Sequence, residues 1–333
     1  MAVMPKIMSP FMDGLAHKDD NERLQQLSQY ILLNPGTPSD WGSNRNVLPT
    51  NFGLAASSMM PYSLDADKVT RLNSRNNNAI TYAQLLDALK VSSIALKISI
   101  HPIFNTSIDM LPSINQGNQT NYNFVVNTEN SGLAVASDLS GYLVVGNHTE
   151  HMVNSTDSNG KGAASFIVPN SLTGSALLIV LARADADPNA VSYGIYSFGI
   201  NASAPEPNET FTRFSPLNYT LNASLTYPNE RISAAYELSY DYSANLTLLS
   251  NASQSVEYSF PRFLDNSARI LVITGFNGTK PFAEWDTYPQ IPLDIGVNFD
   301  SSTSNVSVAS FTYIVTINSA LYALQIECRE VGQ

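Results

Sequence analysis

The sequence predicts a mainly β fold, with a helix-rich N-terminal module of α+β type followed by two antiparallel β-sandwich-like domains. Before residue 92, apolar residues recur at spacings of three and four, which is the helical period; after it they alternate. Short runs rich in Val, Ile, Tyr and Phe then follow one another, separated by turn residues. A chain of 333 residues is long enough to bury several cores. We expect domains at residues 1–92, 93–204 and 205–333.

Three helices are predicted in the first domain. The first is capped by Asp19 or Asp20 and stops before Pro35, because a Pro-Gly pair ends a helix. The second follows Ser63, and the third begins at Thr81, a residue type that caps helices. Their inner faces carry these apolar residues: Leu24, Leu27, Ile31, Val69, Leu72, Leu85, Leu86 and Leu89. The spacings predict amphipathic helices around a common core.

The middle domain is predicted from the change to alternation. Leu96, Ile98 and Ile100 share one face, as in a half-buried strand. Further strands are expected at 122–127, 141–146, 163–168, 176–183 and 191–198. The apolar run 176–182 ends at Arg183 and is far shorter than the roughly 18 residues that span a bilayer, so it predicts a buried strand. Several short strands without helices favour an antiparallel sandwich.

The segment 202–208 is the best candidate linker, because Pro205 and Pro207 among polar neighbours disfavour both helix and sheet. Strand-like runs continue at 217–225, 232–238, 246–249, 256–260, 268–273, 291–299 and 307–326. The sequence shows no regular internal repeat, which argues against a solenoid or a propeller. We expect a second sandwich or an open sheet. Cys328, the single cysteine, excludes an internal disulfide and is expected as a small apolar side chain in a terminal strand.

Two motifs stand out in the first domain. Pro-Gly-x-Pro-x-x-Trp-Gly occupies residues 35–42 and Leu-Asp-x-x-Lys-Val occupies residues 64–69, together with Asn51-Phe-Gly-Leu and Thr81-Tyr-Ala-Gln-Leu-Leu. As an ordered set over about the first 104 residues, they resemble a group of archaeal cell-surface proteins with a pilin-like N-terminal module. In such proteins a hydrophobic helix precedes the module and anchors the chain or packs it into a filament. The resemblance implies an upstream helix that is missing from this sequence.

A second resemblance concerns the middle domain. Asn130-Ser-Gly is followed by Gly141-Tyr-Leu-Val-Val, and the turn Thr156-Asp-Ser-Asn-Gly leads into Ala163-Ala-Ser-Phe. This succession resembles immunoglobulin-like modules of prokaryotic surface proteins. In that likeness Asp-Ser-Asn-Gly is the turn before the next strand. The resemblance implies an immunoglobulin-like β-sandwich.

Twelve Asn-x-Ser/Thr sequons lie after residue 104, whereas composition alone predicts roughly five. The nine Asn residues among the first hundred positions carry none. N-linked glycan is attached outside the cytosol and on accessible backbone, so the pattern predicts an extracellular protein. It also indicates that the helical module meets other surroundings, near a membrane or in a filament core. The predicted glycosylation sites are Asn105, Asn118, Asn147, Asn154, Asn201, Asn208, Asn218, Asn222, Asn245, Asn251, Asn277 and Asn305.

The sequence offers little for catalysis or metal binding. His148 and His151 are predicted on a turn, where no helical spacing aligns them as ligands, so we interpret them as solvated. Asp157 starts a calcium-like pattern, but Val168 stands where that loop needs Glu, so a β-turn is expected. Helix-dipole or solvated roles are expected for Asp65, Asp67, Asp185 and Asp187. With no phosphate loop, nucleophile elbow or Cys–His pair, we predict no metal, no cofactor and no catalytic residue.

The charge pattern restricts the partners. The net charge is −11, charged residues make up 14% of the chain, and no Lys/Arg cluster is visible. Nucleic acid is therefore excluded as a partner. The expected partners are covalent N-linked glycans and, through the N-terminal helix, further copies of the chain or other cell-surface components.

Three functions remain open. The leading hypothesis is a non-enzymatic, N-glycosylated structural or adhesive surface protein, membrane-anchored or assembled into a filament through the upstream segment. The alternative is a carbohydrate- or peptide-binding module, expected if the last domain has a cleft lined by Tyr or Trp285 with unpaired polar groups. A secreted hydrolase would need carboxylates or His converging in a pocket. We interpret the sixteen Tyr residues as sheet packing rather than as a contact surface.

Overall fold

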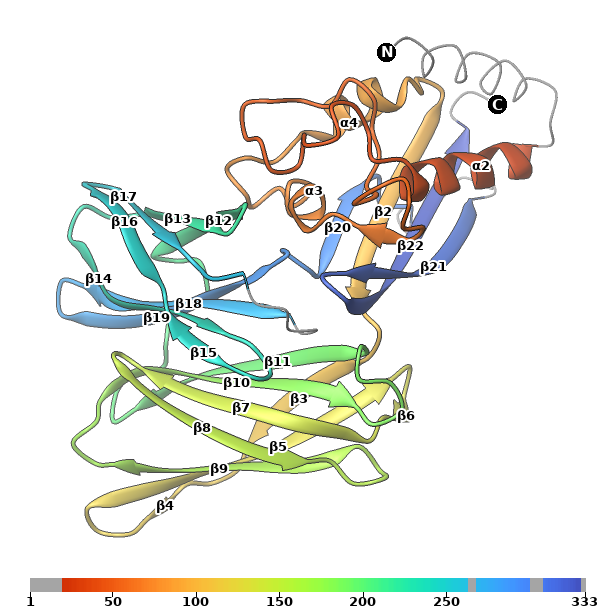
Figure 1. The fold of residues 1–333 in the computed structure, drawn as a ribbon. Coiled ribbons are helices and arrows are strands. Elements are labelled where there is room, and N and C mark those ends of the chain that lie inside the picture. Colours follow the sequence, from red (N-terminus) through yellow and green to blue (C-terminus); the bar gives the residue numbers. More distant parts are fainter. Residues whose placement is uncertain (1–19, 263–267, 300–307, 331–333) are drawn as a thin grey trace.

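The computed structural model describes residues 20–262, 268–299 and 308–330, and over these residues the chain is mainly β (Figure 1). The helices of this part are α2 (Asp20–Leu33), α3 (Ala66–Thr70) and α4 (Tyr82–Leu89). Almost all other regular structure is antiparallel sheet. The predicted fold class is confirmed.

The strands run in the following order: β1 (Ser63–Leu64), β2 (Ile94–Pro102), β3 (Asn105–Met110), β4 (Ile114–Asn115), β5 (Gln119–Asn130), β6 (Leu133–Ala134), β7 (Ser137–Val145), β8 (His148–Ser155), β9 (Lys161–Pro169), β10 (Gly174–Ala184), β11 (Val191–Ile200), β12 (Thr212–Leu217), β13 (Thr220–Leu225), β14 (Glu230–Leu238), β15 (Ser243–Asn245), β16 (Thr247–Ala252), β17 (Ser255–Ser259), β18 (Arg269–Asn277), β19 (Lys280–Tyr288), β20 (Leu293–Gly296), β21 (Ala309–Ile317) and β22 (Ala320–Glu330).

The N-terminal helices lie where the periodicity predicts them. Every predicted inward residue is buried except Leu86, which is half-buried. Thr81 caps α4 in a capping box with Gln84, and Asp65 caps α3 by accepting from two backbone N–H groups. Asp19, one of the two candidate caps of the first helix, lies outside the described residues, and α2 starts at Asp20.

The two motifs of the first domain pack together, because the second motif supplies a side chain that binds the loop carrying the first. Lys68 is fully buried, and its Nζ donates to the carbonyl oxygens of Pro35 and Ala55 at 2.9 and 2.8 Å. Arg71 donates to three further carbonyls of the same loop, including that of Trp41. Gly36 has a φ of +78°, and a Cβ there would lie 2.8 Å from the Trp41 Nε1. The motif residues are therefore explained by backbone conformation and by carbonyl oxygens that need donors.

The strand pairing departs from the predicted boundary of the third domain. The first unit contains a sheet of order β1-β21-β22-β2-β20, so residues 293–330 return to the N-terminal module. β2 pairs with β22 on one side and with β20 on the other. The predicted ranges 93–204 and 205–333 therefore each hold residues of two structural units, because β2 and β20–β22 belong to the sheet of the first unit. The range 307–326 was predicted as one long strand. Its described residues, 308–326, form a hairpin that turns at Asn318 and Ser319, both with positive φ.

The middle unit is a two-sheet antiparallel sandwich, which confirms the immunoglobulin-like β-sandwich prediction at this level. One sheet has the order β11-β10-β7-β8, and the other is formed by β3, β4, β6 and β9 around β5. Phe124, Val126, Leu143, Phe166 and Val180 belong to the core between them. The sequence analysis missed β3 and β8 as strands. In particular, His148 and His151 lie on β8 and not on a turn.

The third unit is a second sandwich, with sheets of order β12-β13-β17-β16 and β15-β14-β18-β19. Of the two predicted alternatives, a second sandwich or an open sheet, the structure has the sandwich. Residues 217–225, predicted as one strand, split into β12 and β13 because Asn218 and Tyr219 form a left-handed turn with φ of 46° and 59°.

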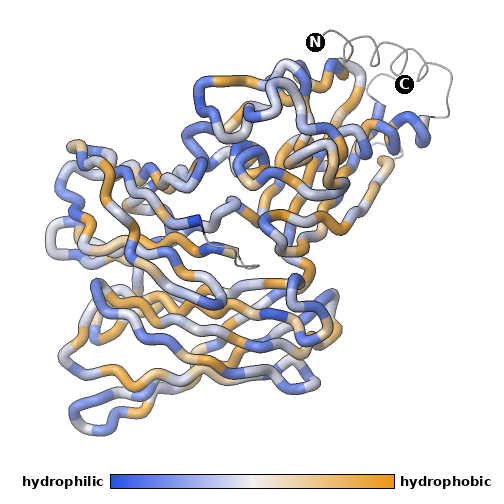
Figure 2. The backbone as a smooth tube through the Cα atoms, in the orientation of Figure 1, coloured by the Kyte–Doolittle hydropathy of each residue, from blue (hydrophilic) through white to orange (hydrophobic). Residues whose placement is uncertain are grey.

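The two sandwiches stack face to face, so four sheet layers lie on one another (Figure 1). Leu177, Ile179 and Leu181 of β10 pack with Ile270 and Val272 of β18 in a core separate from both sandwich interiors. β10 is thus buried on both faces, which accounts for its uninterrupted apolar run, predicted correctly as a buried strand. In Figure 2 the hydrophobic stretches follow such strands, while the outer turns are mostly hydrophilic.

The predicted linker 202–208 is fastened to the edge of the third unit. The side chain of Asn208 donates to the Trp285 carbonyl and accepts from the Trp285 N–H, at 2.8 and 2.9 Å. Glu206 forms an ion pair with Lys280 on the same strand, β19. Since β19 is an edge strand, the segment covers backbone groups that would otherwise face solvent. Cys328 is fully buried in β22, as predicted, and burial raises the pKa of its thiol to about 12.

Candidate functional site

The eleven sequons that lie in the described residues all belong to the two sandwiches or their connection. Eight of these Asn residues are exposed: Asn105, Asn118, Asn147, Asn154, Asn201, Asn218, Asn245 and Asn251. Asn208, Asn222 and Asn277 are half-buried. Asn305 lies outside the described residues, between β20 and β21 of the first unit's sheet. The exposed set satisfies the accessibility that a glycan requires.

Some sequon side chains already serve the fold. Asn208 is held by its two bonds to Trp285, and Asn201 Nδ2 donates to two carbonyls at 3.2 Å. Attachment of a sugar leaves one hydrogen on the amide nitrogen, so a glycan on Asn201 would cost one of these bonds. Asn105, in contrast, is exposed on β3. The sites are therefore not equivalent: Asn208 combines partial burial with a structural role.

The third sandwich is open along one side, between β16, an edge strand of one sheet, and the part of β14 that β15 leaves uncovered in the other. β15 pairs only with residues 236–238 of β14. A groove of about 960 Å³ follows this opening, and it is lined by seven consecutive β14 residues, 230–236. Because successive side chains point to opposite faces, a lining by consecutive residues means that the groove runs along the strand edge. The other wall is formed by β16 and β17.

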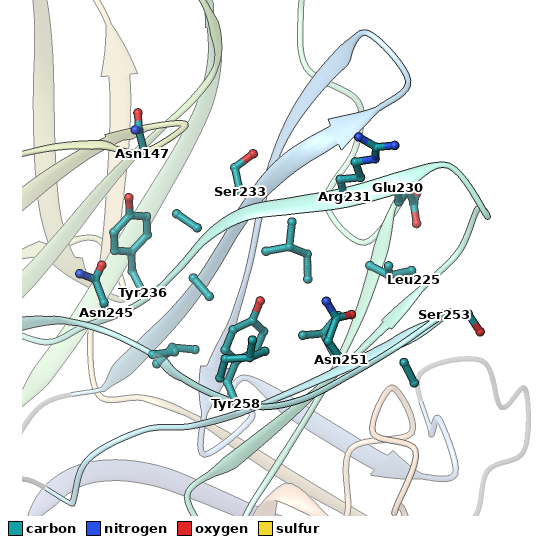
Figure 3. A pocket seen from close by; sticks show the side chains of 17 residues that line it. Asn147, Leu225, Glu230, Arg231, Ser233, Tyr236, Asn245, Asn251, Ser253 and Tyr258 are labelled. Atoms are coloured by element: carbon teal, nitrogen blue, oxygen red, sulfur yellow. The ribbon is translucent and has the colours of Figure 1, made fainter.

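The groove wall carries polar and aromatic side chains (Figure 3). Tyr236 and Asn245 lie at one end with Asn147, while Glu230 and Arg231 lie at the other. Glu230 is 6% exposed, and its Oε2 accepts from the Tyr227 N–H at 2.9 Å. Its Oε1 has no hydrogen-bond partner among the described residues. Burial raises the pKa of Glu230, because a buried carboxylate loses hydration. Glu230 Oε1 is itself buried, so this oxygen lies behind the groove wall and is not open to the groove.

Two more buried carboxyl groups lie on β19, where it meets the start of β12 and the first unit. Glu284 accepts from the N–H groups of Phe211 and Thr212 at 2.9 and 2.7 Å. Burial raises the pKa of Glu284 to about 7, against the opposing effect of these bonds. Burial likewise raises the pKa of Asp286 to about 6, although Arg75 lies 3.7 Å away. Glu284 connects the two sheets of the third sandwich, Asp286 contacts Arg75 of the first unit, and neither carboxyl lines the groove.

Asp67 makes buried hydrogen bonds in addition to the helix-dipole role that was predicted for it. Its Oδ1 accepts from the Tyr288 hydroxyl at 2.8 Å and from the Asn218 N–H at 2.7 Å. Burial raises the pKa of Asp67. Asp67 thus connects α3 to the third sandwich, beyond the helix-dipole role expected from sequence. No local pattern shows this contact, because its partners lie about 150 and 221 residues away in the chain.

His148 and His151, which the sequence analysis considered as metal ligands, each contact a polar side chain of β7 or β8. His148 Nε2 lies 2.9 Å from Glu150 Oε1, and His151 Nε2 lies 2.9 Å from Ser140 Oγ. With an odd separation on one strand, the two imidazoles point to opposite faces. Within residues 20–262, 268–299 and 308–330, no group of three His, Cys, Asp or Glu side chains could hold a metal ion.

The turns predicted at Asp157 and Asp187 are present in the structure. Asp157 accepts from the N–H groups of Asn159 and Lys161, and these bonds lower the pKa of its exposed carboxyl. Asp187 accepts from the Asn189 N–H in the turn between β10 and β11. Among the helices that the structure describes, none is both long and apolar enough to cross a membrane.

The fold defines a class: a protein with two stacked antiparallel β-sandwiches and a small α+β unit. No family model matches the chain, and no curated protein matches it either. Similar solved structures include the FN1–FN3 domains of chicken CNTN1, at 10% identity and a TM-score of 0.20, covering 60% of this chain and 68% of that one.

Two further similar structures are a red sea bream transglutaminase and TarS of S. aureus. The transglutaminase has 11% identity and a TM-score of 0.19, with 62% of this chain and 32% of that chain covered. TarS has 10% identity and a TM-score of 0.17, with 46% and 35% covered. The match therefore spans only about a third of these two proteins. The description of the sandwiches rests on their strand pairing and buried cores.

Proposed function

We propose that this chain is an extracellular, N-glycosylated structural or adhesive surface protein without enzymatic activity. Its α+β unit would lie nearest to a membrane or filament core, and the stacked sandwiches would project outward and carry the sugar. The chain N-terminal to α2 would provide the anchor or filament contact, as the pilin-like resemblance implies. Partners would be further copies of the chain or other surface components.

One observation carries this proposal: the distribution of the sequons over the fold. All eleven described sequons lie on the sandwiches or their connection, and eight of their Asn side chains are exposed. The range 1–92, with its three helices, has none. The packing of α2 on β21 and β22 also suits a module whose helix continues toward an anchor. The stacked double sandwich is a rigid spacer because its units share buried apolar cores.

Mass spectrometry of intact protein and of its peptides, purified from its native host, tests the proposal. We expect hexose-containing adducts on several exposed sequons. Unmodified Asn at all twelve sites would refute the glycoprotein function. Localisation by antibody labelling of intact cells is the second test, since a protein that is labelled only after the cells are broken open is not a surface protein.

A carbohydrate- or peptide-binding module is the second candidate, and the groove favours it. The sequence predicts for this function a cleft of the last domain with Tyr residues and unpaired polar groups. Tyr236 and Tyr258 line such a groove, together with the exposed polar side chains of Arg231 and Ser233. Calorimetric titration with oligosaccharides and extended peptides would show saturable binding that Arg231→Ala, at an exposed lining residue, weakens. Trp285, the other aromatic residue considered, lies on β19 and not in the groove.

A further inference from the structure

The edge strand β16 has only one of the usual protections against strand pairing, a bulge between Leu248 and Ser250. Its six residues, Thr247–Ala252, are all exposed, and none is charged. Leu248 and Leu249 are 54% and 53% exposed, so both faces of the strand present an apolar side chain to solvent. β16 pairs with β17 on one side only. Natural sheets protect such edges with charge, proline, bulges or a covering segment, because a free edge pairs with other chains.

The opposite wall of the groove is also an open edge. Residues 230–234 of β14 pair with β18 and have no strand partner on their groove side among the described residues. The register shift between Leu248 and Ser250 bends β16 but leaves both leucines exposed. Two unpaired edges thus face one groove, and a strand from another molecule could add to either.

Three sequons converge on this groove from different parts of the chain. Asn245 ends β15 and Asn251 lies within β16. Asn147 reaches the groove from the turn between β7 and β8 of the middle sandwich. That turn is fixed to the third sandwich, because the Gly146 carbonyl accepts from Thr274 Oγ1 at 2.8 Å. In Figure 3 these Asn side chains lie along the groove, with Asn251 between Tyr258 and Leu225.

We propose that the N-linked glycans of Asn245 and Asn251, together with that of Asn147, occupy this groove and protect the edges of β14 and β16. The inference rests on the proposed glycosylation. Sugar rings cover the exposed leucines and exclude an incoming strand sterically. The groove wall suits this occupant, since the exposed side chains of Arg231 and Ser233 can donate to sugar hydroxyls. The glycans at these sequons would prevent strand pairing, as charged residues do on the edge strands of other sheets.

The test compares glycosylated full-length chains from the native host. One variant is Asn245→Gln with Asn251→Gln; another, Thr247→Ala with Ser253→Ala, removes the same sequons and keeps both Asn residues. The matched control is Asn105→Gln, which removes an exposed sequon of β3, far from the groove. Light scattering gives the average mass of the particles in solution as a function of protein concentration. Hydrogen exchange measures the deuterium uptake of the backbone amides of β14 and β16.

We expect both groove variants to associate at concentrations where the parent and the Asn105→Gln control do not. Deuterium uptake in β14 and β16 should rise in dilute samples. Adding Leu248→Lys and Leu249→Lys to a groove variant should restore the parent mass, since charge replaces sugar as the edge protection.

Two results would overturn the inference while leaving the glycoprotein function intact. One is glycan on other sequons but none on Asn147, Asn245 or Asn251. The other is glycan at these sites whose removal changes neither mass nor exchange relative to the Asn105→Gln control. Absence of glycan from every sequon would instead refute the proposed function itself.

Discussion

The pH dependence of stability should change when Glu284 is replaced by Gln. Glu284 is 3% exposed, and burial raises its pKa from 4.5 to about 7. The folded state therefore binds a proton more tightly than the unfolded state does. It follows that the free energy of unfolding rises as the pH falls from about 7 toward 4.5, and that this contribution is constant below the lower value.

The magnitude follows from the two pKa values. Their difference corresponds to roughly 3 kcal/mol as an upper bound, at about 1.4 kcal/mol for each pH unit. In the Glu284→Gln variant this part of the slope between pH 8 and pH 5 should vanish. The slope that remains comes from other groups, such as Asp286, whose burial also raises its pKa. Each oxygen of Glu284 accepts from one of these N–H groups, the amides of Phe211 and Thr212, whereas Gln has a single acceptor oxygen, so the variant also loses one of the two hydrogen bonds.

Urea unfolding followed by circular dichroism at pH 5, 6, 7 and 8 measures both slopes. Glu129→Gln, at the exposed end of β5, is the matched control and should keep the parent slope. A parent protein and a Glu284→Gln variant with the same pH slope would show that Glu284 is not buried as a proton-binding group. A parent slope of the opposite sign, reduced by the variant, would mean that its two backbone donors outweigh the loss of hydration.

Three other substitutions probe the fold. Lys68→Met should destabilise the first unit by about 2–4 kcal/mol and expose residues 35–55 to protease, because two carbonyl oxygens lose their donor. Ile179→Ala should cost about 2–4 kcal/mol in urea unfolding, since this fully buried residue packs between the sandwiches; Ile167→Ala, 52% exposed, should cost much less. Asn208→Gln should lower the thermal midpoint by an amount equivalent to about 1–2 kcal/mol, whereas Asn105→Gln, compared in unglycosylated protein, should leave it unchanged. Equal effects within either matched pair would contradict the respective assignment.

Much of the fold could be predicted because local patterns were consistent with it. The 3.6-residue period of Leu24, Leu27 and Ile31 requires a helix with one buried face, and α2 buries these residues. The seven-residue run in β10 predicts a buried strand because no polar face interrupts it. β8 was missed because its sequence, His148–Ser155, is polar on both faces and gives no alternation.

The candidate site could be predicted only in part. The sequons are readable from sequence, but their convergence on one groove is not, because Asn147 and Asn245 belong to different sandwiches. The roles of Asn208 and Glu284 were missed for the same reason. Asn208 bonds to a strand 77 residues away, and Glu284 accepts from backbone 72 residues away. The one local signal was a set of acidic residues in the otherwise β-rich run of β19.

The sequence by itself determined the kinds of element, their approximate places, the change from helix to strand near residue 92, and the restriction of sequons to the later part. These properties follow from side-chain periodicity and short motifs, which act within a few residues. The tertiary structure alone decided that β20, β21 and β22 pair with β2, that the two sandwiches share a buried face, and that β14 and β16 leave a groove between them. Strand pairing uses backbone groups that every residue carries, so which strands meet depends on the packing of whole sheets and not on a local pattern.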